Sequence, residues 1–323
     1  MKSVGVIGEG AWGTAISSVL ADNGCEVALW CHDAAVAVQI NNEHRNDRYM
    51  PGFVLSDYIV AHEDLSLVLD NDLIFISTPM KYFRNVVEQC KKYYRSEQQW
   101  VVLSKGIEND TLLLPSQILM ELLSSQIKCS VLGGPSFAQE VMGKKLTGVN
   151  IAAIQQSFTT ELVQIIQNNY FRTFPINDLI GIQTGGALKN VLAFLMGMVD
   201  GLGYSDDTRA LFFTHGWQEM LVVAQSLGAQ QETLSGLAGI GDVFLTVTGR
   251  FSRNVLVGKA FGEGKSLDHI LKETGYIPEG INTIKTVEQI IQKNRLTLPL
   301  FDALYNIVYN GTAPKELVLV IAR

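Results

Sequence analysis

Residues 3–13 decide the fold, and they read SVGVIGEGAWG. The first five form a short β-branched run typical of a buried strand, and a G-x-G-x-x-G pattern follows at Gly8, Gly10 and Gly13. In such a loop the first glycine allows a tight turn, the second lets the backbone approach a pyrophosphate, and the third lets helix and strand pack closely. The sequence therefore predicts a dinucleotide-binding loop rather than an ordinary strand-to-helix turn.

The residues beyond this loop extend the same alternation. Helical spacing over Ala11 to Asn23 is followed by Gly24, where a left-handed C-terminal cap would fall. Further strand-like runs follow, separated by helical stretches, at Glu26–His32, Leu73–Ser77, Val101–Ser104, Ser130–Leu132 and Val149–Ile154. This alternation predicts an α/β fold of the Rossmann type, with a mostly parallel sheet and helices on both faces.

After about residue 180 the strand-like runs largely stop. The long segments that remain have helical spacing, at Gly185–Val199, Asp207–Leu227, Ile281–Lys293 and Pro299–Asn310. We therefore expect residues 1–184 to form an NAD(P)-binding domain and residues 185–323 to form an all-α C-terminal domain for substrate and catalysis. No low-complexity linker separates them, so the cleft between the two domains is the expected place for a ligand.

Composition limits the possible functions. The 323 residues are 47% hydrophobic and 18% charged, which is enough apolar material for a buried core. The formal net charge of -7 is opposite in sign to that of a nucleic-acid or anionic-membrane binder. The longest uninterrupted apolar run, Val191–Val199, is much shorter than the roughly 20 residues that cross a bilayer. We therefore expect no membrane span. The first residues lead directly into the glycine loop, which cleavage of a leader would remove, so we expect no signal peptide and a cytoplasmic protein.

The cysteines point away from a disulfide framework and from a metal site. Cys25, Cys31, Cys90 and Cys129 form no C-x-x-C pair, and no histidines stand at metal-ligand spacing. We expect free thiols in a reducing compartment and no bound metal.

The end of the second predicted strand leaves the choice between NAD and NADP open. Asp33 stands 20 residues after Gly13 and directly follows His32. An acidic group at this position would bond the ribose hydroxyls of NAD, whereas a histidine could lie against the 2′-phosphate of NADP. We expect both cofactors to be accepted, with catalytic efficiencies that differ by less than roughly a thousandfold.

Two charged residues stand alone in long apolar stretches. Lys189 is the only charge in residues 179–199, and Asp242 is the only charge in residues 233–249. The helix around Lys189 is apolar nearly all round, so this lysine is expected to face a cleft. Burial disfavours the ammonium form, which suits acid/base catalysis near neutral pH. A snorkelling lysine or a buried ion pair explains Lys189 equally well, and an aspartate after three glycines is ordinarily a helix N-cap.

Further segments could meet an anion. Arg253, with Ser252 and Asn254, offers a guanidinium, a hydroxyl and an amide to a phosphate, although such a cluster is more often solvated surface. Lys105 ends one predicted strand and Gly133–Ala138 ends another, and ligands bind at such ends in open α/β sheets. An ordinary turn explains either segment equally well.

Together these segments resemble the NAD(P)-dependent glycerol-3-phosphate dehydrogenases of bacteria, from the glycine loop to about residue 284. The most specific pieces are Ser104–Glu108, Gly134–Ala138, Gly185–Asn190, Gly241–Asp242, Ser252–Asn254 and Pro278–Gly280. The resemblance implies reversible hydride transfer between NAD or NADP and C2 of glycerol 3-phosphate or dihydroxyacetone phosphate, in the supply of the phospholipid backbone. It also implies a homodimer, which is usual in such families.

The resemblance assigns tasks to individual residues. It implies that Lys189 protonates the C2 alkoxide as catalytic acid/base, that Asp242 positions it, and that Lys105 offers charge near that oxygen. The implied substrate-binding residues are Lys105, Gly134, Ser136, Lys189, Asn190, Asp242, Ser252, Arg253 and Asn254. The implied cofactor-binding residues are Gly8, Gly10, Ala11, Trp12, Gly13, His32, Lys105, Ala138, Arg253, Ile277 and Glu279.

Two positions in the glycine loop depart from the family pattern. Glu9 stands where a small residue is usual, and Ala11 stands where a serine or an asparagine is usual. Loss of the side-chain hydrogen bond from position 11 is expected to weaken cofactor binding by about 1 kcal/mol.

Two other functions remain possible from the residues alone. The first is a noncatalytic nucleotide-binding redox sensor, which would not need Lys189. The second is another two-domain dehydrogenase acting on a hydroxy acid or a sugar acid, which the possible phosphate site at Arg253 disfavours.

Overall fold

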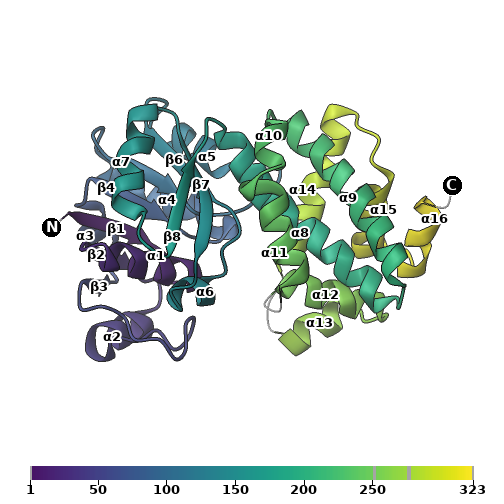
Figure 1. The fold of residues 1–323 in the computed structure, drawn as a ribbon, viewed down its shortest axis with the longest axis horizontal. Helices are drawn as coiled ribbons and strands as arrows, with labels where there is room; N and C mark the ends of the chain where they lie inside the picture. The colour runs from purple at the N-terminus through teal and green to yellow at the C-terminus, as the bar shows by residue number, and fades with distance from the viewer. Residues whose placement is uncertain (1, 250–251, 275–277, 322–323) are drawn as a thin grey trace. The chain divides into compact units, whose positions relative to one another are not determined.

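Strand β1 (Ser3–Ile7) lies inside an eight-stranded sheet, between β2 (Glu26–Trp30) and β4 (Leu73–Ile76). The strand order is β3-β2-β1-β4-β5-β6-β7-β8. Figure 1 shows the sheet with helices packed around it. The remaining strands are β3 (Ile59–His62), β5 (Gln99–Val102), β6 (Lys128–Gly133), β7 (Thr147–Ala153) and β8 (Phe171–Pro175). All neighbours pair in parallel except β6 with β7, which confirms the predicted mostly parallel sheet.

This computed structural model describes residues 2–249, 252–274 and 278–321. The chain divides into two compact units. The first consists of Met1–Lys105 and Leu114–Ile182 and contains the sheet, whereas the second consists of Gly106–Leu113 and Gln183–Arg323 and is helical. Residues 106–113 thus group with the helical unit, although they follow β5 along the chain.

Two strands have no counterpart in the predicted pattern, and they form the two edges of the sheet. Strand β3 is four residues long, with Val60 47% exposed, and β8 has alternating buried and exposed residues before it ends at Pro175. Edge strands are short and partly solvated, so they lack the continuous apolar run that marks a strand buried on both faces.

Helices cover both faces of the sheet. On one face, Val4 and Val6 belong to a buried apolar cluster with residues of α1, α2 and α7. On the other, a Cβ added to Gly5 would stand 2.5 Å from the carbonyl oxygen of Val68 in α3, so this helix lies directly against the strand. The α-helices of this unit are α1 (Ala11–Asp22), α2 (Ala34–Glu43), α3 (Leu65–Leu69), α4 (Met80–Cys90), α5 (Pro115–Leu122), α6 (Ala138–Met142) and α7 (Gln156–Ile166).

The second unit is built around α8 (Leu179–Gly201). Among the described helices, only α8 is long and apolar enough to cross a membrane by length and composition, and 89% of its apolar window is buried inside the molecule. The other α-helices are α9 (Asp206–Ser226), α10 (Gln231–Leu234), α11 (Asp242–Thr248), α12 (Arg253–Gly262), α13 (Leu267–Thr274), α14 (Glu279–Asn294), α15 (Pro299–Tyr309) and α16 (Leu317–Ile321). The predicted helical second half is therefore confirmed, and α8 begins six residues earlier than expected.

Glycines let α8 and α12 pack backbone to backbone. A Cβ added to Gly197 would stand 2.1 Å from the carbonyl oxygen of Val255, and one added to Gly258 would stand 2.0 Å from that of Phe194. Because no side chain fits between the helices at these points, the start of α12 is held close to the middle of α8.

The four cysteines are free, as predicted, and all four are buried. Burial raises the pKa of Cys90 and of Cys129 to about 12, so these thiols stay protonated and unreactive at neutral pH. In the part of the chain that the structure describes, no group of three histidine, cysteine or acidic side chains could hold a metal ion.

Candidate active site

The glycine loop leads from β1 into α1. Gly8 has a φ of +111°, a conformation that suits glycine, and Gly10 is the N-cap of α1. A Cβ on Gly13 would stand 1.8 Å from the carbonyl oxygen of Gly8, whereas one on Gly10 would meet nothing within 4 Å. The loop is thus closed against α1 at Gly13 and open at Gly10, where a ligand could approach the backbone.

Two further observations fit a bound dinucleotide. The hydroxyl oxygen of Thr78, just beyond β4, is buried without a hydrogen-bond partner. Thr78 lies beside the loop, because a Cβ on Gly8 would stand 3.5 Å from its backbone nitrogen. Among the described residues, no side chain caps the N-terminus of α1, and its amide groups carry the positive end of the helix dipole. The loop therefore suits phosphate groups.

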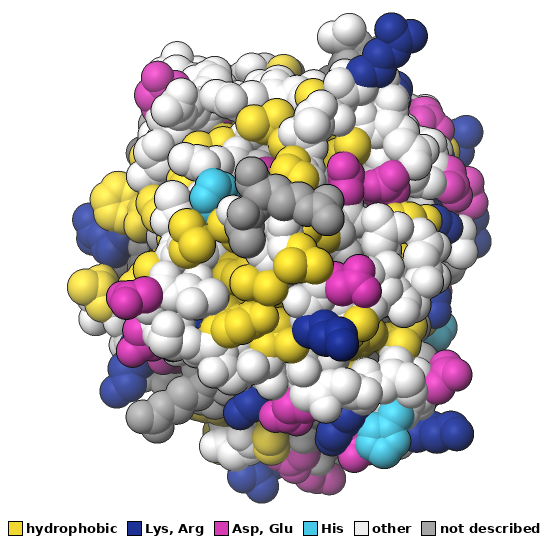
Figure 2. Space-filling view, turned by 90° about the vertical axis from the view of Figure 1, so that its right-hand side faces the viewer, with side chains coloured by type: hydrophobic (Ala, Val, Ile, Leu, Met, Phe, Trp, Pro, Cys, Tyr) yellow, Lys and Arg dark blue, Asp and Glu magenta, His cyan; other side chains and the backbone are white. Residues whose placement is uncertain are grey.

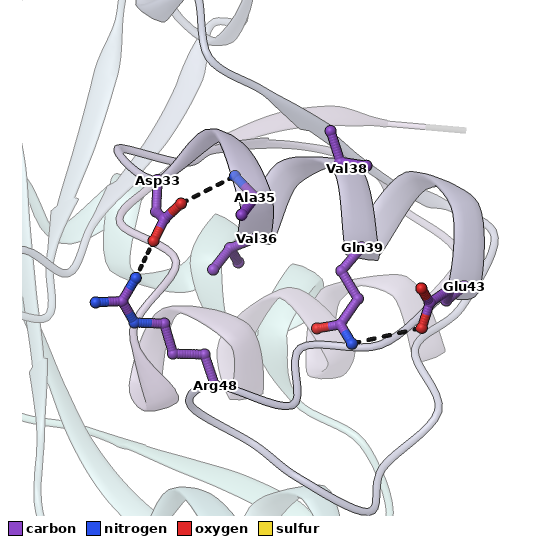
Figure 3. A pocket seen from close by; sticks show the side chains of 7 residues that line it. All are labelled: Asp33, Ala35, Val36, Val38, Gln39, Glu43 and Arg48. Atoms are coloured by element: carbon purple, nitrogen blue, oxygen red, sulfur yellow. Dashed lines mark hydrogen bonds and ion pairs between the residues drawn. The ribbon is translucent and has the colours of Figure 1, made fainter.

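The end of β2 carries several charges. The Asp33 carboxylate accepts a hydrogen bond from the backbone N–H of Ala35 at 2.9 Å, which caps α2, and it also pairs with Arg48. His32 is exposed beside these residues. A pocket of about 360 Å³ lies along α2, with Asp33 and Arg48 at one end (Figure 3).

The predicted residues after β5 and β6 lie at the same edge of the sheet as the glycine loop, because these strands run parallel to β1. Lys105 is partly buried just beyond β5. After β6, Gly134 has a φ of +147°, and a Cβ there would stand 3.1 Å from the Cα of Val149. The Ser136 hydroxyl donates to the carbonyl oxygen of Gly134 at 3.0 Å, and Ala138 begins α6.

In the helical unit, Lys189 of α8 forms a buried ion pair with Asp242 at the start of α11. Only 11% of the lysine side chain and none of the aspartate side chain is exposed. The backbones that carry them are in contact, since a Cβ on Gly185 would stand 2.2 Å from the carbonyl oxygen of Ala238. Each member of the pair lies four residues beyond one of these contact points, so the two side chains meet one helical turn further on.

A second polar group adjoins Lys189. The Asn254 side-chain amide donates to Oδ1 of Asn190 at 3.0 Å, and its own Oδ1 accepts the backbone N–H of Gly280 at 3.0 Å. A Cβ on Gly280 would stand 2.6 Å from that oxygen, so glycine is needed for the contact. Consecutive residues of α8 thus bear the ion pair and the amide group.

The remaining predicted residues lie at helix starts. Ser252 is buried and caps α12 by accepting the backbone N–H of Val255 at 3.5 Å, and Arg253 is the exposed first residue of that helix. Glu279 is the exposed first residue of α14. Ile277 lies outside the described residues.

Sequence reasoning did not single out Thr78 or the N–H of Gly280. The position of Thr78 directly after an apolar strand was a usable signal, whereas nothing local marks the Gly280 contact. The predicted residues that the structure does bring together are Lys189 with Asp242, Asn190 with Asn254, and Gly134 with Ser136.

A Rossmann-type unit with an open glycine loop, and an all-helical unit with a buried lysine–aspartate pair, define an NAD(P)-dependent dehydrogenase. Comparison with family models identifies which one. Residues 3–159 match the N-terminal model of NAD-dependent glycerol-3-phosphate dehydrogenase, and residues 178–319 match the C-terminal model. The chain belongs to the NAD-dependent glycerol-3-phosphate dehydrogenase family.

Individual relatives agree. A Bacillus anthracis protein named as an NAD(P)+ glycerol-3-phosphate dehydrogenase is 36% identical over 321 residues, which are 98% of this chain and 94% of that protein. The crystal structure of glycerol-3-phosphate dehydrogenase from Coxiella burnetii superposes with a TM-score of 0.94 at 30% identity, covering 100% of this chain and 99% of the other. The yeast enzyme gives a TM-score of 0.88 at 30% identity, with the same coverage.

Proposed function

We propose that this protein reversibly reduces dihydroxyacetone phosphate to sn-glycerol 3-phosphate with NADH or NADPH. Family membership supports the reaction, and the buried pair of Lys189 and Asp242 is the observation that carries the mechanism. Taking both charges out of water costs desolvation energy that can exceed the gain from their attraction, so stability alone does not account for the pair. The next residue of α8, Asn190, is held by the side-chain amide of Asn254, so the same stretch of helix carries the ion pair and an oriented amide.

In the proposed reaction, Lys189 holds a proton on Nζ and donates it to the oxygen at C2 as the ketone is reduced. The bound nicotinamide supplies the hydride, and in the reverse direction it accepts it. Asp242 orients the amine and balances its charge. Lys105 of the first unit and Asn190 of the second are assigned to the same substrate oxygen, where they offset the negative charge that develops on it.

We assign the substrate phosphate to Arg253, Ser252 and Asn254, with Gly134 and Ser136 contributing from the first unit. Arg253 at the first turn of α12 combines a guanidinium fork with a helix N-terminus, and both favour phosphate oxygens. The Asn254 amide is held in place by Asn190 and Gly280, so it is oriented before any ligand arrives.

We assign the cofactor chiefly to the glycine loop and the strand ends beside it. The proposed contacts are with Gly8, Gly10, Ala11, Trp12, Gly13, His32, Lys105, Ala138, Arg253, Ile277 and Glu279. In this scheme residues 1–184 are the NAD(P)-binding domain and residues 185–323 the domain for substrate and catalysis.

We further propose a cytoplasmic homodimer that supplies the glycerophospholipid backbone. The helical unit exposes large apolar side chains, including Phe244 at 66%, Leu256 at 60% and Leu319 at 50%. On the face shown in Figure 2, hydrophobic side chains gather in the middle, with charged side chains mostly around them. Exposed apolar surface of this kind is what a subunit contact buries, which supports the dimer.

The test follows cofactor absorbance with dihydroxyacetone phosphate for the wild type, for Lys189→Ala and for the control Lys293→Ala. Lys293 is an exposed lysine of α14. Its substitution removes one positive charge, as Lys189→Ala does, but leaves the ion pair of Lys189 and Asp242 intact. We expect Lys189→Ala to lower kcat by roughly 10²- to 10⁴-fold and Lys293→Ala to leave it unchanged. Retained turnover in Lys189→Ala would reject the acid/base role.

The same assay separates the other functions. A nucleotide-binding redox sensor would bind the cofactor without turning over the ketone. A dehydrogenase for hydroxy acids or sugar acids would turn over such substrates in preference to dihydroxyacetone phosphate, and Arg253→Ala would leave its KM unchanged.

A further inference from the structure

A carboxylate stands inside the glycine loop. Glu9 lies between the first two glycines, yet only 7% of the residue is exposed. Its Oε1 accepts a hydrogen bond from the backbone N–H of Asp33 at 3.2 Å. Charged side chains are rarely buried to this extent, so the loop carries an acidic group turned toward the end of β2.

The surroundings of that group are mainly acidic. Burial, followed by the negative charges of Glu9 and Glu63, raises the pKa of the Cys31 thiol to about 12. Both carboxylates therefore lie within electrostatic range of the last residues of β2. Arg48 is a nearby cation, but it is paired with the side chain of Asp33 (Figure 3). A second anion brought to this place would meet three carboxylates, one guanidinium that already pairs with Asp33, and the exposed imidazole of His32.

The two cofactors differ at the group that a Rossmann-type unit receives at the end of β2. NAD offers a ribose hydroxyl there, which can donate to a carboxylate. NADP carries a phosphate monoester with a charge of about -1.5 to -2, which needs N–H donors and positive charge. Glu9 occupies the N–H of Asp33 and adds a negative charge, so it opposes a phosphate in two ways.

We propose that Glu9 makes this chain prefer NAD over NADP, while NADP still binds. The inference rests on the proposed function as a dinucleotide-dependent enzyme and names the side chain that sets its cofactor preference. Glu9 acts by occupying a backbone donor and by electrostatic repulsion, and it touches neither the reacting carbon nor the hydride.

The test measures dissociation constants for NADH and NADPH by isothermal titration calorimetry, without substrate. Glu9→Gln keeps an oxygen for the N–H of Asp33 and removes the charge, whereas Glu9→Ala removes both. Glu26→Gln is the matched control, because Glu26 is an exposed carboxylate at the first residue of β2, the opposite end of that strand from the one that Glu9 contacts. Circular dichroism melting verifies that each variant is folded.

We expect the wild type to bind NADPH at least about tenfold more weakly than NADH, and Glu9→Gln to reduce this ratio by roughly tenfold. Glu9→Ala should reduce it further, and Glu26→Gln should leave it within about twofold of the wild type. The proposal is overturned if the wild type binds both cofactors equally, or if neither Glu9 variant changes the ratio. Failure of the wild type to bind either dinucleotide would overturn the proposed function as well.

Discussion

Lys189 and Asp242 stand 53 residues apart in the sequence and form an ion pair that water scarcely reaches. Lys189 belongs to α8, the longest helix of its unit. Asp242 begins a helix that follows a short π-helical segment, Leu237–Gly241, in backbone contact with α8. Neither residue has another charged neighbour in sequence, so the fold pairs two charges that each stand alone in an apolar stretch.

Removal of one partner should cost stability as well as activity. Lys189→Met removes the ammonium that pairs with a carboxylate that is 0% exposed, and we expect a loss of about 3–5 kcal/mol in the free energy of unfolding. The double variant Lys189→Met with Asp242→Asn should recover most of that loss but no turnover. Urea denaturation together with the activity assay measures both. A single variant that unfolds at the wild-type urea concentration would show that the pair is not buried in solution.

Two glycines of the loop should have different roles, with Gly13 needed for stability and Gly10 needed for cofactor binding. Gly13→Ala forces a Cβ against the carbonyl oxygen of Gly8, and we expect it to destabilise the protein by roughly 1–3 kcal/mol. Gly10→Ala places its Cβ in open space, so thermal stability should be kept while NADH binds roughly tenfold more weakly. Equal effects of the two substitutions on both melting temperature and cofactor affinity would contradict this division.

Ala11→Ser should strengthen cofactor binding. It returns a hydroxyl to the first residue of α1, and one added hydrogen bond corresponds to about 1 kcal/mol, or about a fivefold lower dissociation constant. Ala34→Ser is the matched control, since Ala34 is the exposed first residue of α2. An unchanged dissociation constant for Ala11→Ser would remove the explanation based on the missing side-chain bond.

The contact between α8 and α12 should tolerate no added methyl group. In Gly258→Ala the new Cβ meets the carbonyl oxygen of Phe194, so the helices must separate at a cost of roughly 1–3 kcal/mol or more. Because Arg253 begins the same helix, KM for dihydroxyacetone phosphate should also rise. Lys259→Ala, at an exposed position on that helix, should change stability by less than about 0.5 kcal/mol. A comparable loss in both variants would refute the close packing.

One buried carboxylate should make stability depend on pH. Glu219 of α9 accepts the backbone N–H groups of Leu300 and Phe301, each at 2.8 Å, at the start of α15. Burial raises its pKa from 4.5 to about 7, against the lowering effect of these two bonds. The folded protein therefore binds this proton more tightly than the unfolded chain does.

It follows that the contribution of Glu219 to the free energy of unfolding is greatest below pH 4.5 and is lost as the pH rises through about 7. We expect the wild type to lose stability relative to Glu219→Gln between pH 5 and pH 8. Urea denaturation of both proteins across this range gives the difference directly. Parallel stability profiles for the two proteins would show that Glu219 ionises normally.

The core of the fold was predictable because its signals are local. Gly24 takes the left-handed conformation expected after α1, with a φ of +80°, and the buried strands carry the continuous apolar runs that mark them. The edge strands β3 and β8 were not predictable in this way, because a strand that pairs on one side only leaves no such run.

The candidate site, like the fold, was predictable from the sequence only in part. Isolation in an apolar stretch was enough to single out Lys189 and Asp242. It left a catalytic lysine no better supported than a snorkelling lysine or a buried ion pair, and it favoured a helix N-cap for Asp242. Arg253 and Lys105 were no more distinctive than ordinary surface or turn residues until the resemblance to a family gave them roles.

The amino-acid sequence alone determined the nucleotide loop, the order of the buried strands and the long helices, and the residues worth testing, because propensity and periodicity act over a few neighbours. Only the tertiary structure decided that Lys189 meets Asp242, that Asn254 joins Asn190 to Gly280, and that Glu9 reaches the end of β2. These contacts join segments far apart in the chain, and they depend on how closely backbones pack, which no local pattern records.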